Sequence, residues 1–104
     1  METIINNEVG FLNLIWSLKN YSQNTLLIKL GSFGAYAPSG IKIPEDDQKI
    51  SVNGKQLTAK TPYPKMALDF YHITKANDGL FARAASINWG LKIIDVMQST
   101  VFGV

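Results

Sequence analysis

Cysteine is missing from this 104-residue chain, and histidine and arginine occur once each, as His72 and Arg83. Without cysteine the chain has no disulfides, no thiolate metal ligands and no thiol nucleophile, and it is compatible with a reducing compartment. One arginine argues against sequence-specific DNA binding, because the guanidinium is preferred for bidentate contacts to phosphate and guanine. One histidine leaves little material for a histidine-rich metal site. We therefore expect no metal and no cofactor.

Long apolar runs are also missing. The best candidate, residues 91–97, contains Lys92 and Asp95 and is far shorter than the roughly 18 apolar residues that a membrane span needs. The first seven residues carry an acid and no base, which does not resemble the start of a secretory signal peptide. These features predict a cytoplasmic protein that does not associate with a membrane.

Charge is nearly balanced, with ten basic and eight acidic residues. The resulting net charge of +2 is too small to indicate a general nucleic-acid-binding surface. Hydrophobic residues make up 46% of the chain, which is typical of a globular protein, and the length suits one domain. We expect a single α+β domain over residues 1–104.

Apolar residues at helical spacing predict an N-terminal helix over residues 7–21, with Asn6 or Asn7 as its cap. Residues 25–30 are rich in aliphatic side chains and predict a strand buried on both faces, with Lys29 reaching solvent at its end. Asn53-Gly54 predicts a hairpin over residues 49–58, because both central positions of the favoured two-residue turn need a positive φ. A small, mainly antiparallel sheet over residues 25–60 follows.

The C-terminal part is predicted to be helical and to pack on one face of that sheet. Pro64 favours a helix over residues 64–77 that stops at Asn77-Asp78-Gly79. Apolar spacing continues from Leu80, so we favour one long, bent helix over residues 80–97. Trp89-Gly90 interrupts the pattern, and residues 91–97 contain enough β-branched side chains to form a strand instead.

Motifs for catalysis are weak. His72 lies one helical turn from Asp69 and could act as a general base that the carboxylate orients, which makes a small enzyme a remote hypothesis. The glycines of residues 31–34 resemble only part of a phosphate-binding loop, and no serine lies in a nucleophile motif. Residues 45–47 are acidic but lack the ligand spacing of a calcium loop. We therefore predict no catalytic residue and a protein that is not an enzyme.

Aromatic and basic residues around the predicted hairpin suggest a binding surface. Such residues hold a nucleotide or a single strand by stacking and charge, although a solvated hairpin explains them too. We expect a protein or a small anionic ligand to bind there, with sequence-tolerant binding of single-stranded nucleic acid as the alternative. The candidate ligand-binding residues are Phe33, Tyr36, Lys49, Lys55, Lys60, Tyr63 and Lys65.

Small residues in the C-terminal segment suggest an interface. Ala82 and Ala85 would let another helix approach closely, and Phe81 and Trp89 flank them with apolar surface. The partner could be a second copy of the chain, or the N-terminal helix and the sheet of the same chain. The sequence thus predicts a non-enzymatic, homo-oligomeric binding or interaction module.

Overall fold

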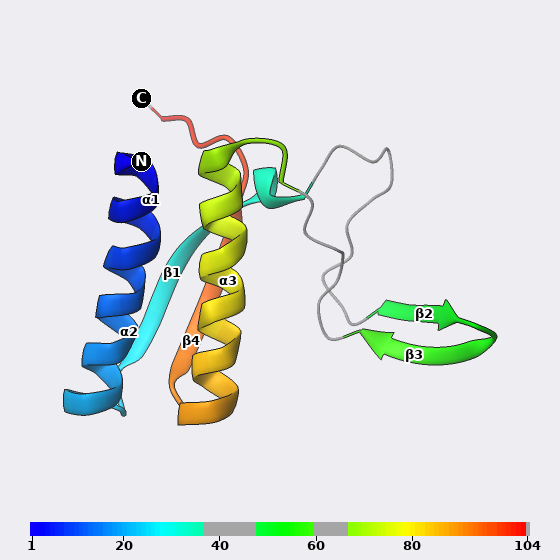
Figure 1. The fold of residues 1–104 in the computed structure, drawn as a ribbon, viewed down its shortest axis with the longest axis horizontal. Coiled ribbons are helices and arrows are strands. Elements are labelled where there is room, and N and C mark those ends of the chain that lie inside the picture. The colour runs from blue at the N-terminus through cyan, green and yellow to red at the C-terminus, as the bar shows by residue number, and fades with distance from the viewer. Residues whose placement is uncertain (37–47, 60–66, 104) are drawn as a thin grey trace.

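The computed structural model describes residues 1–36, 48–59 and 67–103, and these form an α+β structure, as the sequence predicts (Figure 1). Helical segments and two small sheets alternate along the chain. In order they are α1 (Glu2–Ile4), η1 (Ile5–Val9), α2 (Gly10–Tyr21), β1 (Leu26–Ser32), η2 (Phe33–Ala35), β2 (Gln48–Val52), β3 (Lys55–Ala59), α3 (Phe70–Trp89) and β4 (Lys92–Gln98).

Strands β1 and β4 form a parallel pair, in which Leu26 aligns with Lys92 and Ser32 with Gln98. The N-terminal helix and α3 stand side by side against one face of this pair (Figure 1). The arrangement differs from the predicted mainly antiparallel sheet over residues 25–60. Strand β1 pairs in parallel with β4, and the β2–β3 hairpin forms a separate two-stranded sheet. Helix α3 is the crossover that a parallel connection requires.

The N-terminal helix begins at Glu2 and includes a π-helical turn, η1, before α2. The predicted caps Asn6 and Asn7 therefore lie inside the helix. The amide of Asn7 donates to Thr74 Oγ1 over 2.9 Å, and Glu8 Oε1 accepts from the amide of Asn77 over 2.7 Å. These bonds attach the N-terminal helix to α3.

Helix α3 runs through the predicted stop and ends before the predicted helix end. Asp69 caps its start, and Asp78 is buried within it. Gly90 adopts a left-handed conformation with φ of 69° and ends the helix, after which residues 92–98 form β4. The prediction of helix over residues 80–97 is therefore wrong beyond residue 89, and the expected helix start at Pro64 lies outside the described residues.

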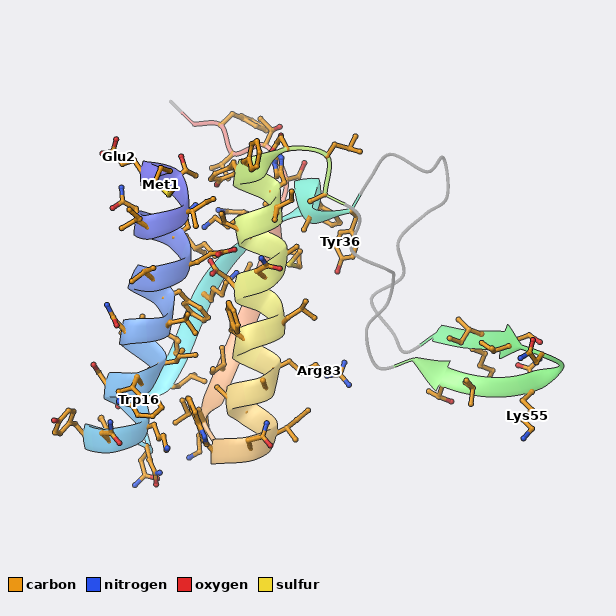
Figure 2. The ribbon with its side chains drawn as sticks, viewed as in Figure 1. Met1, Glu2, Trp16, Tyr36, Lys55 and Arg83 are labelled. Atoms are coloured by element: carbon orange, nitrogen blue, oxygen red, sulfur yellow. The ribbon has the colours of Figure 1, made fainter. Side chains whose placement is uncertain are left out.

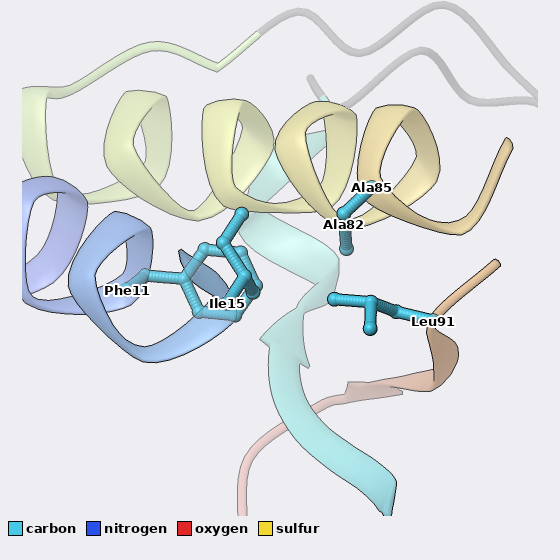
Figure 3. Packing of buried hydrophobic residues seen from close by; sticks show 5 residues of the cluster. All are labelled: Phe11, Ile15, Ala82, Ala85 and Leu91. Atoms are coloured by element: carbon cyan, nitrogen blue, oxygen red, sulfur yellow. The ribbon is translucent and has the colours of Figure 1, made fainter. Parts of the chain in front are cut away.

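The main core lies between α2, α3 and the start of β4. Figure 3 shows its five buried members, which are Phe11, Ile15, Ala82, Ala85 and Leu91. The two alanines share this cluster with Phe11 and Ile15 of α2, and their small side chains leave room for the larger ones. Close helix contact is thus achieved within one chain.

The sequence suggested that Lys29 reaches solvent, and this prediction is wrong. Lys29 lies buried on the helix-covered face of β1. Its Nζ pairs with Asp95 Oδ1 of β4 over 3.2 Å, directly across the parallel register. Gly31 follows on the same face, where any side chain would collide with Asp95 and Met97. The pair therefore fixes the register of β1 and β4 through a buried charge.

The β2–β3 hairpin confirms the predicted turn and register. Asn53 and Gly54 have positive φ of 50° and 77°, and Ile50 aligns with Leu57. Ile50, Val52 and Leu57 are exposed, so no part of the described chain covers the apolar face of the hairpin. Figure 1 shows the hairpin apart from the helices and from β1 and β4.

In the described residues, no helix is both long and apolar enough to cross a membrane.

Candidate functional site

The carboxyl end of β1 meets the first turns of α3. Strand β1 ends at Ser32, and the short helix η2 that follows packs against α3 (Figure 1). Functional groups in parallel α/β arrangements collect at this end of the strands, where loops and helix starts converge. The end of β1 and the start of α3 therefore form the candidate functional site.

Ser32 and Gly34 shape the strand end. Ser32 Oγ accepts a hydrogen bond from the backbone N–H of Gly34 over 3.1 Å and so caps η2. Gly34 lies against the imidazole of His72, and a Cβ at residue 34 would overlap three atoms of that ring. Glycine is thus required for the close contact between η2 and α3.

Asp69 orients His72 from the start of α3. Its Oδ1 accepts from the backbone N–H of His72 and its Oδ2 pairs with the ring Nδ1, both over 2.7 Å. Both hydrogen bonds lower the pKa of the Asp69 carboxyl, and the bond from the backbone N–H has the larger effect. The pairing proposed from sequence is therefore present, with the ring packed against η2.

Tyr71 and Lys75 lie one helical turn apart on α3. Lys75 Nζ donates to the backbone carbonyl of Leu30 over 3.3 Å and lies 5.8 Å from the centroid of the Tyr71 ring. Tyr71 is 48% exposed, and its ring meets that of His72 edge to face at 5.1 Å. The structure thus holds an ammonium group beside an accessible phenol.

Buried polar contacts anchor this turn. Thr74, which is fully buried, donates through Oγ1 to the carbonyl of Tyr71 over 2.6 Å and accepts from Asn7. Both bonds restrain the backbone between Tyr71 and Lys75. The N-terminal helix therefore contributes to the site by holding α3 in place.

Asp78 lies one turn below Lys75 and is only 3% exposed. Its Oδ1 has no hydrogen-bond partner in the described part of the chain. Burial raises the pKa of this carboxyl, and the positive charges of Lys29 and Lys75 oppose the shift. Asp78 is therefore a buried acid one helical turn from Lys75.

This arrangement suits proton transfer. Tyrosine, lysine and histidine all serve as acid–base groups in enzymes, and here Lys75 Nζ lies near the ring of Tyr71, which meets that of His72, at one strand end. Within residues 1–36, 48–59 and 67–103, no cluster of three or more histidine or acidic side chains could hold a metal ion. The acid–base groups at the described site include Tyr71, Lys75 and His72, with the Ser32 hydroxyl at the strand end beside them.

The predicted ligand-binding residues are only partly brought together. Phe33 of η2 and Tyr36 just after it lie 6.4 Å apart between their ring centroids. Tyr36 is buried, however. Its burial, and to a lesser extent the negative charge of Asp95, raise the pKa of its hydroxyl. Lys49 and Lys55 belong to the separate hairpin, and Figure 2 shows Lys55 at its tip and Tyr36 away from it. The other three, Lys60, Tyr63 and Lys65, lie outside the described residues.

The predicted interface residues lie on α3. Ala82 and Ala85 face the chain's own core, which is the second of the two alternatives that the sequence left open. Phe81 and Trp89 are half-buried and border a shallow groove between α2 and α3. The Trp89 ring packs edge to face on Trp16 at 5.5 Å, and Lys19 Nζ lies 4.6 Å from both centroids.

Sequence reasoning missed Tyr71 and Lys75 as a pair. The only available signal was their spacing of four residues in a predicted helix, which places two side chains on one face. Ser32 was missed as well, because no serine of the chain lies in a nucleophile motif. Its position at a strand end beside α3 depends on the pairing of β1 with β4.

The curated proteins that match this chain include two that match nearly all of it. UDP-sulfoquinovose synthase of Spinacia oleracea, a chloroplastic protein, is 36% identical over 99 residues, which are 95% of this chain and 20% of the relative. UDP-sulfoquinovose synthase of Sulfolobus acidocaldarius is 34% identical over 102 residues, which are 97% of this chain and 25% of the relative. The chain thus spans a fifth to a quarter of the length of these relatives. No protein-family model matches it.

These matches correct the functional prediction. Both relatives are synthases, and such similarity over almost the entire chain contradicts a non-enzymatic binding module. The description as a binding protein, with its alternative of a nucleic-acid-binding protein, is wrong for the same reason. The expected homo-oligomer stays a prediction, because an enzyme can also be an oligomer. The enzyme was missed because a tyrosine and a lysine four residues apart form a far less distinctive local pattern than the known histidine, cysteine, serine or glycine-rich motifs.

Proposed function

We propose that this chain supplies an acid–base centre, built on Tyr71 and Lys75, to an enzyme that forms UDP-sulfoquinovose. The observation that carries the proposal is the Lys75 ammonium, which is held beside the exposed Tyr71 phenol at the carboxyl end of β1. Both curated relatives carry this activity in their names.

Each residue of the centre has a role. Tyr71 exchanges a proton with the sugar, because its ring is accessible and its position is fixed by the anchored turn. Lys75 stabilises the negative charge that develops on the phenol oxygen during the exchange. Ser32 presents a hydroxyl at the adjacent strand end. His72, paired with Asp69, holds η2 against α3 and is a positioning residue.

The proposal assigns only part of an enzyme to this chain. Because the chain corresponds to 20% and 25% of the two relatives, most of the surface that recognises a nucleotide-linked sugar is expected in the remaining sequence. The described residues then supply proton transfer and the support for it. A reducing, cytoplasmic location remains a prediction from the missing cysteine.

A chimera tests the proposal. This chain replaces the matching 99 residues of the Spinacia oleracea relative, and formation of UDP-sulfoquinovose is measured. We expect an active chimera, and Tyr71→Phe should lower its rate by about 10²–10⁴-fold, the usual contribution of a positioned acid–base group. Circular dichroism should show the same folded content in both proteins.

Tyr21→Phe is the matched control, because Tyr21 lies at the exposed end of α2 and far from the site in sequence and structure. It should leave the rate unchanged. A folded chimera that works equally well with Tyr71→Phe would disprove the assignment of Tyr71. A folded chimera without activity would contradict the proposed function itself.

A further inference from the structure

Asp78 is a buried acid in the middle of α3, and the proton-transfer centre does not use it directly. Its side chain is almost fully enclosed, and Oδ1 has no hydrogen-bond partner among the residues that the structure describes. A carboxylate buried in this way destabilises the fold. Residues that lower stability are typical of sites where activity depends on them. Asp78 is therefore a candidate for a functional role.

Four charged side chains lie near enough to Asp78 to act on its ionisation. The positive charges of Lys29 and Lys75 favour its carboxylate, whereas the negative charges of Glu8 and Asp95 oppose it. Lys29 and Asp95 pair with each other over 3.2 Å, and Glu8 accepts a hydrogen bond of 2.7 Å from an amide side chain of α3. Within the described part of the chain, neither Asp78 nor Lys75 forms an ion pair. Each is thus available to the other.

Lys75 and Asp78 lie three residues apart on α3, and this spacing places two side chains on one face of a helix. The Lys75 ammonium donates to the backbone carbonyl of Leu30 over 3.3 Å. A single neutral acceptor restrains a flexible lysine side chain only weakly. Charges act more strongly on each other in the protein interior than in water. The buried carboxylate can therefore attract this ammonium from within the fold.

We propose that Asp78 is a positioning residue, whose negative charge holds the Lys75 ammonium beside the ring of Tyr71. This inference rests on the proposed function, in which Lys75 assists proton transfer by Tyr71. Asp78 acts through Lys75, since its own carboxyl is buried away from any substrate. When Asp78 takes up a proton, the attraction is lost and the rate should fall.

Asp78→Asn in the chimera with the Spinacia oleracea relative tests the inference. The change keeps the shape of the side chain and removes its charge, and circular dichroism verifies the fold. At neutral pH we expect kcat to fall by up to about 100-fold with KM unchanged, the effect of displacing a reacting group by about 1 Å.

The pH dependence separates a role of the charge from a role in packing. Burial raises the pKa of Asp78, so the wild-type carboxyl becomes neutral at a higher pH than an ordinary aspartate. The ratio of wild-type to Asp78→Asn kcat should therefore approach one as the pH falls. Glu2→Gln is the matched control, because it removes the same charge from an exposed position in α1. It should leave kcat and its pH dependence unchanged.

Acetylation of the free 104-residue chain tests the position of Lys75 without relying on catalysis. The chain is treated briefly with acetic anhydride at neutral pH, and peptide mass spectrometry reports the extent of reaction at each lysine. In Asp78→Asn, Lys75 should react several-fold faster than in the wild type, because its ammonium is no longer held by the carboxylate. Lys55, in the separate hairpin, is the internal control and should react at the same rate in both chains.

Three results would overturn the inference: an unchanged kcat of Asp78→Asn in an active chimera, a loss of kcat that is the same at every pH, or unchanged acetylation of Lys75. An inactive wild-type chimera would contradict the proposed function. If Asp78→Asn still accelerated the acetylation of Lys75 in that case, the effect of Asp78 on Lys75 would stand without it.

Discussion

The backbone of Gly34 and the imidazole ring of His72 are in such close contact that no side chain fits between them. Gly34 belongs to η2 at the end of β1, and His72 belongs to the first turn of α3. Asp69 fixes the ring from the other side through Nδ1. This contact sets how closely the strand end approaches Tyr71 and Lys75.

We therefore expect Gly34→Ala to lower the activity of the chimera by about 100-fold, the effect of misplacing reacting groups by about 1 Å. The added methyl group must displace the His72 ring or separate η2 from α3. Steady-state kinetics measures the effect. The matched control is Gly10→Ala, where a Cβ would meet nothing within 4 Å. Equal activity of the two variants would show that the contact does not position the site.

Lys75→Met should reduce the rate by about 10²–10⁴-fold, because it removes the charge beside the Tyr71 phenol and keeps much of the side-chain volume. The measurement is the turnover of the chimera under saturating substrate. Lys55→Met, at the hairpin tip, is the control and should have no effect on turnover. If Lys55→Met were the damaging change and Lys75→Met harmless, the hairpin lysines would be the functional cations and Lys75 would not.

Asp78→Asn should make the chain more stable at neutral pH. Burial raises the pKa of Asp78 above its ordinary value of 3.8, so the folded state binds more protons than the unfolded state between the two values. The free energy of unfolding must then fall as the pH rises from the unfolded-state pKa to the folded-state pKa of Asp78. At higher pH it stays at the lower value. Asparagine has no charge to desolvate and should not show this loss.

Urea unfolding at a series of pH values measures this difference. The advantage of Asp78→Asn over the wild type should disappear at acidic pH, where the carboxyl is protonated in both states. Asp95→Asn provides the contrast, because it leaves the buried Lys29 without its ion-pair partner and should destabilise the chain at neutral pH. A wild-type stability that rises with pH relative to Asp78→Asn would refute the assignment.

Local chemistry made the hairpin predictable. The conformation of Asn53 and Gly54 depends on those two residues, and the turn in turn sets the alignment of Ile50 with Leu57. The N-terminal helix was predictable for the same reason, since its apolar stripe has helical spacing. Its extension to Glu2 was not, because contacts of Asn7 and Glu8 with α3 lie far away in sequence.

Long-range contacts account for most of the errors. Residues 92–98 form a short, largely apolar segment, and such segments occur in helices as well as in strands. This segment is a strand because it pairs with β1. Asp78-Gly79 resembles a helix stop, but Asp78 is buried in the middle of α3, and the segment stays helical. The site is hidden for the same reason, since Lys75 reaches Leu30 across 45 residues.

The pairing of Lys29 with Asp95 spans 66 residues, and it has a consequence during synthesis on the ribosome. Chains elongate at about 5–20 residues per second, so β1 emerges several seconds before β4 is made. For that interval its hydrogen-bonding edge and its aliphatic side chains are available to any other nascent chain. Slow translation of residues 33–98 prolongs this exposure, so the yield of folded protein should depend on codon speed and on chaperones that shield unpaired strands.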